Sequence, residues 1–377
     1  MDIKIKKLID PYPYSQIGQL LKKTYFEEYT EDAGALQWSE KYAKFYFDAI
    51  YYKESSRDFL FGAFDGNKLI GTIFGHRDKV CFEDKLELEM VNLGLTAVDP
   101  KYRRQGIAKD LISKLIEHAK EKNIDFIMSF PEKGRFGNKL LKDHFGFNNY
   151  GKTDHLIKIM EDFGLENVKE LLGLNPVVAK VATLYSKIPD LEITEGKIRE
   201  GNSEDLGPAV NILNSYRSRV PISMIYHKKE FNISNQGFYS LNERFGDPWG
   251  FYWKVLEINN KVLATISYRI EEVKFKKEEK YLNAIVALLT SLAFHEDVEM
   301  DQKKEFLGNI LRQIRTDVPT AFLTQITSPQ HELKLLKKLK FINDRNKYYL
   351  YMKPLTEKSE IINQNKRYKS YFLQYFR

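Results

Sequence analysis

The chain has 377 residues, of which 43% are hydrophobic and 29% are charged, as in folded proteins with room for two domains. Its single cysteine, Cys81, excludes an intrachain disulfide and a multi-cysteine zinc site. The net charge of +7 is spread along the chain, so we do not expect nucleic acid as a partner. No apolar run is long enough to span a membrane, and the charged first residues lack the apolar centre of a secretory signal. We therefore expect a cytoplasmic protein without membrane contact or metal.

The first 160 residues alternate between helical and strand patterns. Asp65 and Gly66 separate two short apolar runs and predict a hairpin. The helix expected after residue 105 carries apolar residues at the spacing of one buried face, so we expect it to pack on a sheet. In chain order we expect helices at 14–29 and 40–51, hairpin strands at 59–64 and 69–74, a long strand at 86–98, a helix at 106–122, a strand at 126–130, a helix at 136–144 and a strand at 152–160.

The second half of the chain repeats this order. The segment NKLIGTI at 67–73 resembles NKVLATI at 260–266, and KLLK occurs at both 139–142 and 334–337. Two matches in the same order, at nearly the same offset, argue for a duplicated unit. Helical stretches are expected at 203–217 and near Met224, before a hairpin around Asn259 and Asn260. The predicted parts are a domain at 1–160, a helical linker at 161–190, a domain at 191–356, and a basic helix or tail at 357–377.

The segment at 95–108 predicts a strand, a turn and the start of a helix. The first N–H groups of a helix have no partner inside it and carry partial positive charge. Gly106 allows a ligand to approach the backbone closely, and Arg103 and Arg104 add positive charge. Together these features indicate a pyrophosphate-binding turn. The alternative is a solvated basic turn before a core helix.

At these residues the sequence resembles the GNAT superfamily of N-acetyltransferases, whose signature is Arg or Gln, two residues, Gly, one residue, and Gly or Ala. Arg103, Gly106 and Ala108 occupy the three positions, and residues 140–147 resemble the family's later helix ending in Gly-Phe. The resemblance implies an α/β (α+β mixed sheet) fold of two tandem domains, each a mostly antiparallel central sheet flanked by helices. It also implies that acetyl-CoA donates an acetyl group to a primary amine of a small molecule, a peptide or a protein.

The resemblance also implies which residues hold the cofactor. The main chain of Thr96, Ala97 and Val98 would pair with the pantetheine arm as an added strand does. Asn138 could bond the pantetheine, or it could equally be a helix N-cap. The pyrophosphate would be held by Arg103, Arg104, Gln105, Gly106, Ile107, Ala108 and Lys109.

The acid and the base are less well defined. Members of the superfamily often use a glutamate on the long central strand, which makes Glu89 the first candidate for the base and Glu87 the second. Both could instead simply face solvent, and Asn92 could orient a water molecule. Lys142 stands where the family has its tyrosine acid, so Tyr150 is considered as a substitute.

Two further patterns concern the region around these groups. Apolar residues occupy every second position of the long strand, and after Met90 this alternation shifts by one residue. The shift predicts a bulge near Gly94. Trp38, Tyr42 and Tyr46 lie in the part of the chain that lines the acceptor pocket in the family. Their spacing of four residues is also that of side chains that pack a helix against a sheet.

The second half lacks the pyrophosphate turn. Residues 294–301, where it should recur, have no glycine and no arginine but four carboxylates, which would repel a pyrophosphate. We therefore expect one cofactor site per chain and a degenerate second half. A non-catalytic acyl-CoA-binding sensor or scaffold is the competing reading, and a nucleic-acid-associated modifier that uses residues 357–377 is a third. The identity of the acceptor and the oligomeric state stay open.

Overall fold

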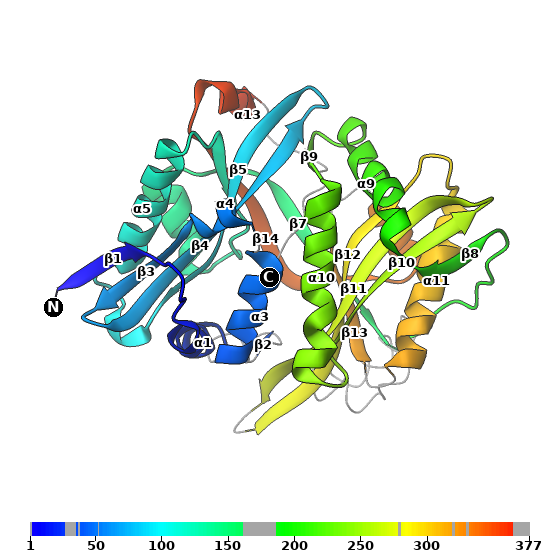
Figure 1. Cartoon of the computed structure of the whole chain (residues 1–377), viewed down its shortest axis with the longest axis horizontal. Helices are drawn as coiled ribbons and strands as arrows, with labels where there is room; N and C mark the ends of the chain where they lie inside the picture. The colour runs from blue at the N-terminus through cyan, green and yellow to red at the C-terminus, as the bar shows by residue number, and fades with distance from the viewer. Residues whose placement is uncertain are drawn as a thin grey trace.

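The structure is a computed structural model that describes residues 2–26, 35–36, 38–51, 53–160, 186–277, 280–318, 321–328 and 332–364. Fourteen strands form one mixed sheet in the order β1-β3-β4-β5-β6-β14-β7-β13-β12-β11-β10-β8, with β2 paired to β11 and β9 paired to β4. Figure 1 shows the first half of the chain on the left in blue and cyan and the second half on the right in green to orange. The predicted mixed sheet with flanking helices is therefore confirmed.

The first half contains the predicted hairpin, long strand and helix. Its helix α5 buries the expected apolar face, and its long strand spans the predicted residues. In chain order the elements are β1 (Ile3–Lys7), α1 (Tyr14–Leu21), η1 (Lys22–Phe26), β2 (Ala35–Leu36), α3 (Glu40–Ile50), α4 (Glu54–Arg57), β3 (Leu60–Asp65), β4 (Lys68–Phe82), β5 (Leu86–Val98), η2 (Pro100–Tyr102), α5 (Ile107–Glu121), β6 (Phe126–Ser129), α6 (Phe136–Lys139), η3 (Leu140–His144) and β7 (Asn148–Ile159).

The second half repeats the pattern with one addition. The stretch near Met224, expected to be helical, is a strand paired with the end of β4, and the helix that follows it, α10, was not predicted. The elements are β8 (Lys197–Glu200), η5 (Ser203–Asp205), α9 (Leu206–Asn214), η6 (Ser215–Ser218), β9 (Ile222–Met224), α10 (Lys228–Phe245), β10 (Gly250–Ile258), β11 (Lys261–Lys277), β12 (Lys280–Phe294), α11 (Met300–Asp317), β13 (Ala321–Ser328), α12 (Leu333–Lys338), β14 (Ile342–Pro354), η8 (Glu357–Glu360) and α13 (Ile361–Gln364).

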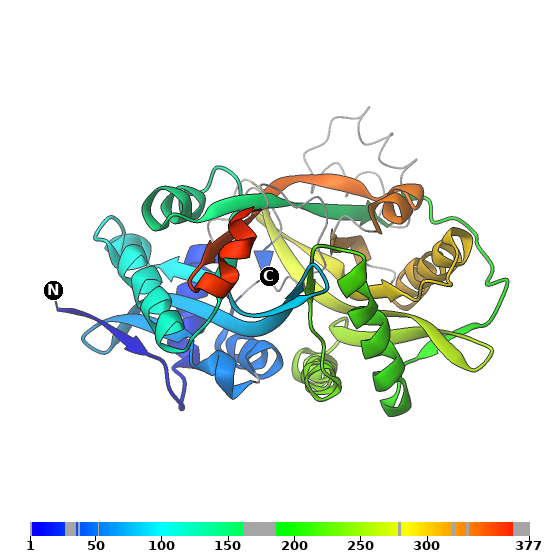
Figure 2. The ribbon, with the colours of Figure 1, turned by 90° about the horizontal axis from the view of Figure 1, so that it is seen from above.

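The two halves exchange their last strands. β14, from the end of the chain, lies between β6 and β7 of the first half, and β7 in turn pairs with β13 of the second half. In Figure 2 the green β7 accordingly runs alongside the orange strands of the second half. All these pairings are antiparallel, whereas β5–β6 and β12–β13 are parallel. The halves are therefore joined through one continuous sheet rather than by surface contact alone.

A bulge occurs at the same place in both halves. In the first half the register slips between Thr72 and Phe74, opposite Leu95, whose φ is 43°. In the second half it slips between Thr265 and Ser267, and Ser291 on the facing strand has a φ of 52°. The bulge predicted near Gly94 is confirmed, and its recurrence supports duplication more strongly than the short sequence matches do.

Predicted regions outside the described residues cannot be compared with the structure. The helical linker expected at 161–190 lies outside them up to residue 185, and so do residues 365–377 of the basic tail. Among the described residues no helix is long and apolar enough to cross a membrane. The same residues contain no group of three or more side chains placed to hold a metal ion.

Candidate acyl-CoA site

The turn before α5 has the backbone shape that a phosphate cradle needs. Gly106 is the N-cap of α5 and has a φ of 85°, in the left-handed region that favours glycine, and Arg104 also has a positive φ of 63°. A Cβ added to Gly106 would meet no heavy atom closer than Asp110 Oδ2 at 4.0 Å. The glycine is therefore required by its conformation, and the space in front of it is open to a ligand.

The first N–H groups of α5 point into this space. Asp110 is the first residue whose N–H finds a partner, the carbonyl of Gly106 at 3.1 Å. In the described part of the chain no acceptor contacts the N–H groups of Ile107, Ala108 and Lys109, as expected for a first helical turn. Four consecutive residues of the predicted turn, Arg103 to Gly106, are exposed. The residues present thus fit a pyrophosphate, since the exposed turn combines positive charge with the free N–H groups of a helix start.

β5 separates from β6 directly beside this turn. The two strands pair only at residues 90–93 of β5, so the edge of β5 beyond Leu93 is not covered by β6. Asp99 donates its N–H to Ile70 O on β4 at 2.8 Å. Because successive residues of a strand point their main-chain groups to opposite sides, those of Val98 face the uncovered edge. An added strand could pair there, as the sequence predicts for the pantetheine arm.

The three residues predicted to pair with pantetheine do not contribute alike. Ala97 is paired with Thr72 of β4, so its main-chain groups point toward β4. The carbonyl of Thr96 accepts a hydrogen bond from the Tyr25 hydroxyl at 2.9 Å, and that of Val98 accepts from Arg103 Nε at 3.2 Å. Because Ala97 and Asp99 direct their main-chain groups toward β4, the Val98 N–H points away from β4. This N–H is the group best placed to donate to a pantetheine carbonyl.

Asn138 lies beside β14, the strand that pairs with β6. It is not an N-cap, because that position of α6 is Arg135, so this alternative is wrong. Its Oδ1 lies 3.1 Å from the Tyr351 hydroxyl of β14, and its Nδ2 is buried without a partner among the described residues. A buried amide donor without a partner is costly, and the pantetheine is the group expected to accept from it.

The equivalent edge in the second half is occupied by side chains. His295 donates its N–H to Leu263 O on β11 at 2.8 Å, as Asp99 does on β4, so the main chain of Phe294 points to the opposite side. There the Phe294 N–H donates to the Tyr216 hydroxyl at 3.1 Å, and its carbonyl accepts from Arg219 at 3.0 Å. The groups that would pair with a pantetheine arm are therefore already used.

A buried network of polar side chains holds Tyr216 in place at this edge. Tyr216 is 1% exposed, and its hydroxyl donates to Glu332 at 2.9 Å. Lys303 lies 3.3 Å from the same carboxylate. Burial, and then the charge of Glu332, raise the pKa of Tyr216, so the hydroxyl stays protonated at any physiological pH. No local sequence pattern could have revealed the contact between Tyr216 and Phe294, because Tyr216 lies 78 residues before Phe294.

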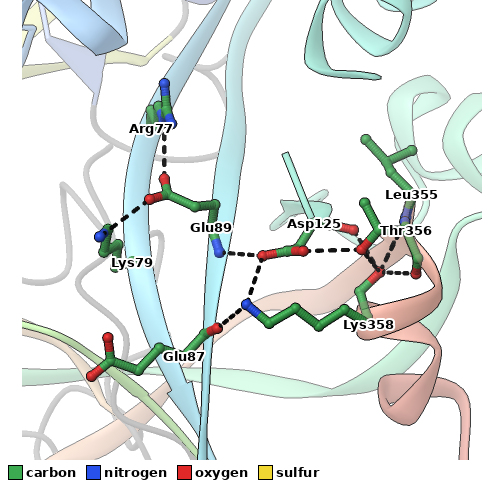
Figure 3. A network of polar contacts seen from close by, with 9 residues as sticks. Arg77, Lys79, Glu87, Glu89, Asp125, Leu355, Thr356 and Lys358 are labelled. Carbon is green, nitrogen blue, oxygen red and sulfur yellow. Dashed lines mark hydrogen bonds and ion pairs between the residues drawn. The ribbon is translucent and has the colours of Figure 1, made fainter. Parts of the chain in front are cut away.

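The two glutamates predicted as bases lie in the part of β5 that is paired with β4, before the pairing with β6 begins. Glu89 contacts Arg77 Nε at 3.0 Å and Lys79 Nζ at 3.4 Å, while Glu87 is 54% exposed and contacts Arg217 at 3.0 Å. Figure 3 shows Glu89 between its two cations and the Glu87 carboxylate directed away from them. Five residues separate Glu89 from Gly94, roughly 17 Å along the strand.

The same network anchors the start of β6. Asp125 accepts hydrogen bonds from the Glu89 N–H at 2.8 Å and from the Thr356 hydroxyl at 3.0 Å. Lys358 reaches both Asp125, at 3.7 Å, and the carbonyl of Glu87, at 2.6 Å (Figure 3). The segment after β14 is thereby tied to the first half of the chain, which supports the exchanged position of that strand.

Tyr150 and the aromatic residues of α3 are part of the core. Tyr150, on β7, is 3% exposed, its hydroxyl lies 2.5 Å from Asn363 Oδ1, and burial raises its pKa. Trp38 packs edge-on against Tyr42 and Tyr46, with ring centroids 5.1 and 5.3 Å apart, and all three are at most 5% exposed. These contacts show that Trp38, Tyr42 and Tyr46 pack together in the core, as their spacing of four residues allowed.

A second cluster of polar groups, which sequence analysis missed, lies between the halves. On β4, His76 Nε2 contacts Asp78 at 2.8 Å, and Lys53 Nζ contacts Asp78 at 2.6 Å and Glu230 of α10 at 2.8 Å. The equivalent positions of β11 hold a second buried pair, Arg269 and Glu271, at 2.7 Å. The duplicated strands thus each carry a buried ion pair at the same place, although the residue types differ.

The charge of Asp78 should make the fold sensitive to acid. Burial alone would raise its pKa, but His76 and Lys53 outweigh burial and lower the pKa to about 2. A lowered pKa stabilises the fold above the unfolded value of 3.8 and loses that effect as the pH falls toward 2. We expect Asp78→Asn to cost about 2 kcal/mol at pH 6 and much less at pH 2, measured by urea unfolding. An equal cost at both pH values would contradict the assignment.

Comparison with known proteins agrees with this geometry. Residues 15–147 match the model of the acetyltransferase (GNAT) family, and no curated protein matches the sequence. The N-myristoyltransferase of Saccharomyces cerevisiae with bound myristoyl-CoA is similar over 93% of this chain and 82% of its own, with a TM-score of 0.72 and 15% identity. A GCN5-related N-acetyltransferase from Anabaena variabilis is similar over 94% of this chain and 73% of its own, with a TM-score of 0.58 and 10% identity.

These likenesses indicate the kind of fold. Residues 15–147 resemble a GNAT acetyltransferase domain. The GNAT fold extends over most of the chain, consistent with two tandem GNAT-like domains. At identities of 10 to 15% the solved structures establish the fold alone.

Proposed function

We propose that the chain is an N-acyltransferase that moves an acetyl group from acetyl-CoA to a primary amine, with the reaction in the first half. The observation that carries the proposal is the contrast between two equivalent places in one chain. The turn at Gly106 and the edge at Val98 are open, whereas the edge at Phe294 is closed by Tyr216 and Arg219. A duplicated fold that keeps one open donor cleft supports one acyl-CoA site per chain.

The residues of the chain would hold the donor along this cleft. The first turn of α5 and Arg103 and Arg104 would bind the pyrophosphate, and the Val98 N–H and Asn138 Nδ2 would bind the pantetheine arm. In the reaction the amine nitrogen attacks the thioester carbonyl carbon, a C–N bond forms, the C–S bond breaks, and CoA leaves as the thiolate. The amine proton passes to a base, which the protein must place near the end of the open edge.

The packing below the opening favours a short acyl group. β5 and β6 close directly beneath it, where Ser129 Oγ donates to Leu93 O at 3.1 Å. Met90, Phe126 and Met128 fill the adjoining core and are each 1% exposed. A longer donor is the second candidate, because the yeast protein of similar fold holds myristoyl-CoA. Steady-state rates with acetyl-CoA and myristoyl-CoA at equal concentration separate the two, and faster turnover of the long donor would reverse the preference.

Glu89 and Glu87 stay predictions for the base, and Tyr150 stays a prediction for the acid. Each is already engaged, Glu89 by two cations, Glu87 by Arg217 and Tyr150 by Asn363. Glu89→Gln should lower kcat by about 100-fold or more if Glu89 is the base, since general bases contribute 10²–10⁴-fold. An unchanged kcat would remove it from the mechanism.

Release of free CoA thiol from acetyl-CoA in the presence of a panel of primary amines tests the proposed activity. We expect amine-dependent release together with a product heavier than the amine by one acetyl group, detected by mass spectrometry. The protein incubated without amine is the control for slow thioester hydrolysis. Binding of acetyl-CoA without turnover across the panel would instead support the sensor or scaffold reading.

A further inference from the structure

Beyond Leu93, β5 has a neighbouring strand on one side only. β4 pairs with β5 through Val98, whereas β6 pairs with it no further than Leu93. On the uncovered side, the main-chain groups of an edge strand must find hydrogen bonds with side chains, water or a ligand. The donor is proposed to bind at this edge, so the side chains that already contact it determine what the donor can bond.

The turn η1 is the element that reaches this edge. It continues α1 as a π-helix, and the buried Thr24 ties it to α1 because its hydroxyl donates to Leu20 O at 2.8 Å. The ring of Tyr25 packs against the core cluster that contains α1 and α3. A π turn closes on the fifth residue rather than the fourth, so it changes the direction of the side chains that follow α1. Single π turns of this kind are frequent at functional sites.

Tyr25 contacts the uncovered edge directly. Its hydroxyl donates to Thr96 O at 2.9 Å. Ala97 is paired with β4, so the carbonyl of the preceding residue, Thr96, faces away from β4. Val98 lies two residues further, roughly 7 Å along the same edge. Tyr25 therefore takes, at Thr96, the place that a neighbouring strand would have.

Lys23 holds the same strand on the other side of Val98. Its Nζ contacts Asp99 Oδ1 at 2.7 Å, and Asp99 is 5% exposed. The same carboxylate oxygen accepts the N–H of Lys101 at 2.9 Å, at the start of η2. The segment from Thr96 to Asp99 is thus held by η1 at both of its ends.

The carbonyl groups of the uncovered edge are already used. Thr96 O accepts from Tyr25, and Val98 O accepts from Arg103 Nε at 3.2 Å. An incoming arm that leaves these bonds intact has to present a carbonyl oxygen to the Val98 N–H. The amide groups of pantetheine provide such an oxygen.

The second half shows the alternative use of a tyrosine at this place. Tyr216 follows α9 as Tyr25 follows α1, but it lies in η6, a 3-10 turn that is wound more tightly than a π turn. Its hydroxyl accepts from the N–H of Phe294, the residue equivalent to Val98. A phenol hydroxyl can donate or accept. Bonded to the N–H it closes the edge, whereas bonded to a carbonyl, as in Tyr25, it leaves the N–H available.

We propose that Tyr25 is a positioning residue for the acyl donor, which holds the Thr96 carbonyl and so fixes the edge at which the Val98 N–H meets the pantetheine arm. This inference rests on the proposed donor site and deepens it. Without the hydroxyl the edge has to be ordered when the donor binds, which lowers affinity. The effect belongs to the pantetheine arm, because the turn at Gly106 that would bind the pyrophosphate has its own hydrogen bonds.

Calorimetric titration of Tyr25→Phe with two ligands tests the proposal. CoA carries the pantetheine arm, whereas 3′-phosphoadenosine 5′-diphosphate keeps the pyrophosphate and lacks the arm. We expect the affinity for CoA to fall by about 3- to 10-fold, the effect of one hydrogen bond, and that for the nucleotide to stay within about 2-fold. The ratio of the two affinities therefore reports the edge at Val98 separately from the turn at Gly106.

Tyr216→Phe is the matched control, since it removes a hydroxyl that bonds the main chain at the equivalent place of the second half. It should leave the ratio of the two affinities at the wild-type value. An unchanged CoA affinity in Tyr25→Phe, or an equal loss for both ligands, would overturn the positioning role and leave the acyltransferase proposal standing. Wild-type protein that binds neither ligand would instead contradict the donor site itself.

Discussion

Gly106→Asp should abolish measurable acyl-CoA binding while the protein stays folded. Two effects arise at this position, a loss of folding stability from strain and a loss of affinity from charge. A residue other than glycine at a φ of 85° is strained, by about 1–2 kcal/mol, and the new carboxylate would stand where the pyrophosphate charge is held. Since every 1.4 kcal/mol is tenfold in affinity, we expect binding to weaken by at least about 100-fold. Isothermal titration calorimetry with CoA measures the loss directly.

Gly66→Asp provides a matched control for strain. Gly66 also has a positive φ, of 60°, and a Cβ there would meet nothing within 4 Å, but it lies in the β3–β4 hairpin turn. This variant should lose a similar amount of stability and keep its CoA affinity. Equal CoA affinity in wild type and Gly106→Asp would show that the donor site has been misplaced. Equal loss in both variants would show that strain, not the site, controls binding.

Arg269→Met should be among the most destabilising substitutions of a single charged residue in the fold. Arg269 and Glu271 are 6% and 0% exposed and lie 2.7 Å apart, and the Tyr42 hydroxyl approaches Glu271 at 3.5 Å. Removing the arginine leaves a buried carboxylate without its cation. Breaking a buried pair in this way costs about 3–5 kcal/mol. Arg244→Met, which breaks the half-exposed pair with Asp48, should cost at most about 1 kcal/mol.

The cost of Arg269→Met should depend on pH. Burial raises the pKa of Glu271 even in the presence of Arg269, and loss of the arginine should raise it further. An acid with a raised pKa in the folded state destabilises the fold as the pH rises through that value. The free energy of unfolding of the variant should therefore be closest to that of wild type near pH 4.5. It should fall further below the wild-type value toward pH 8. Urea unfolding at the two pH values measures this, and a loss that grows toward acid would contradict the buried pair.

Local patterns were enough to predict the turn before α5 and the bulge. Gly106 stands between a strand and an amphipathic helix, so its neighbours define its backbone conformation, and the shift in alternation after Met90 marks the bulge at Leu95. The repeat was visible because β4 and β11 kept similar residues. These features depend on contacts within a few residues of each other in the chain, which is the range over which sequence patterns carry information.

Contacts between distant segments could not be predicted in the same way. The exchange of β7 and β14 joins residues about 190 positions apart, and no pattern in either strand predicts which strand it pairs with. The closure of the edge at Phe294 depends on Tyr216, and the ion pair between the two halves depends on Glu230 meeting Lys53. Helix α10 was not predicted because many of its residues are polar. Its short buried face, which includes Phe231 and Phe238, becomes buried only between the two halves.

The number of CoA molecules that bind one chain tests the central claim most directly. Isothermal titration of the full-length protein with CoA should give one site per chain, since the cleft at Gly106 is open and its counterpart at Phe294 is closed by Tyr216 and Arg219. The single transition should disappear in Gly106→Asp. Two sites per chain, or one site that survives this substitution, would contradict the account.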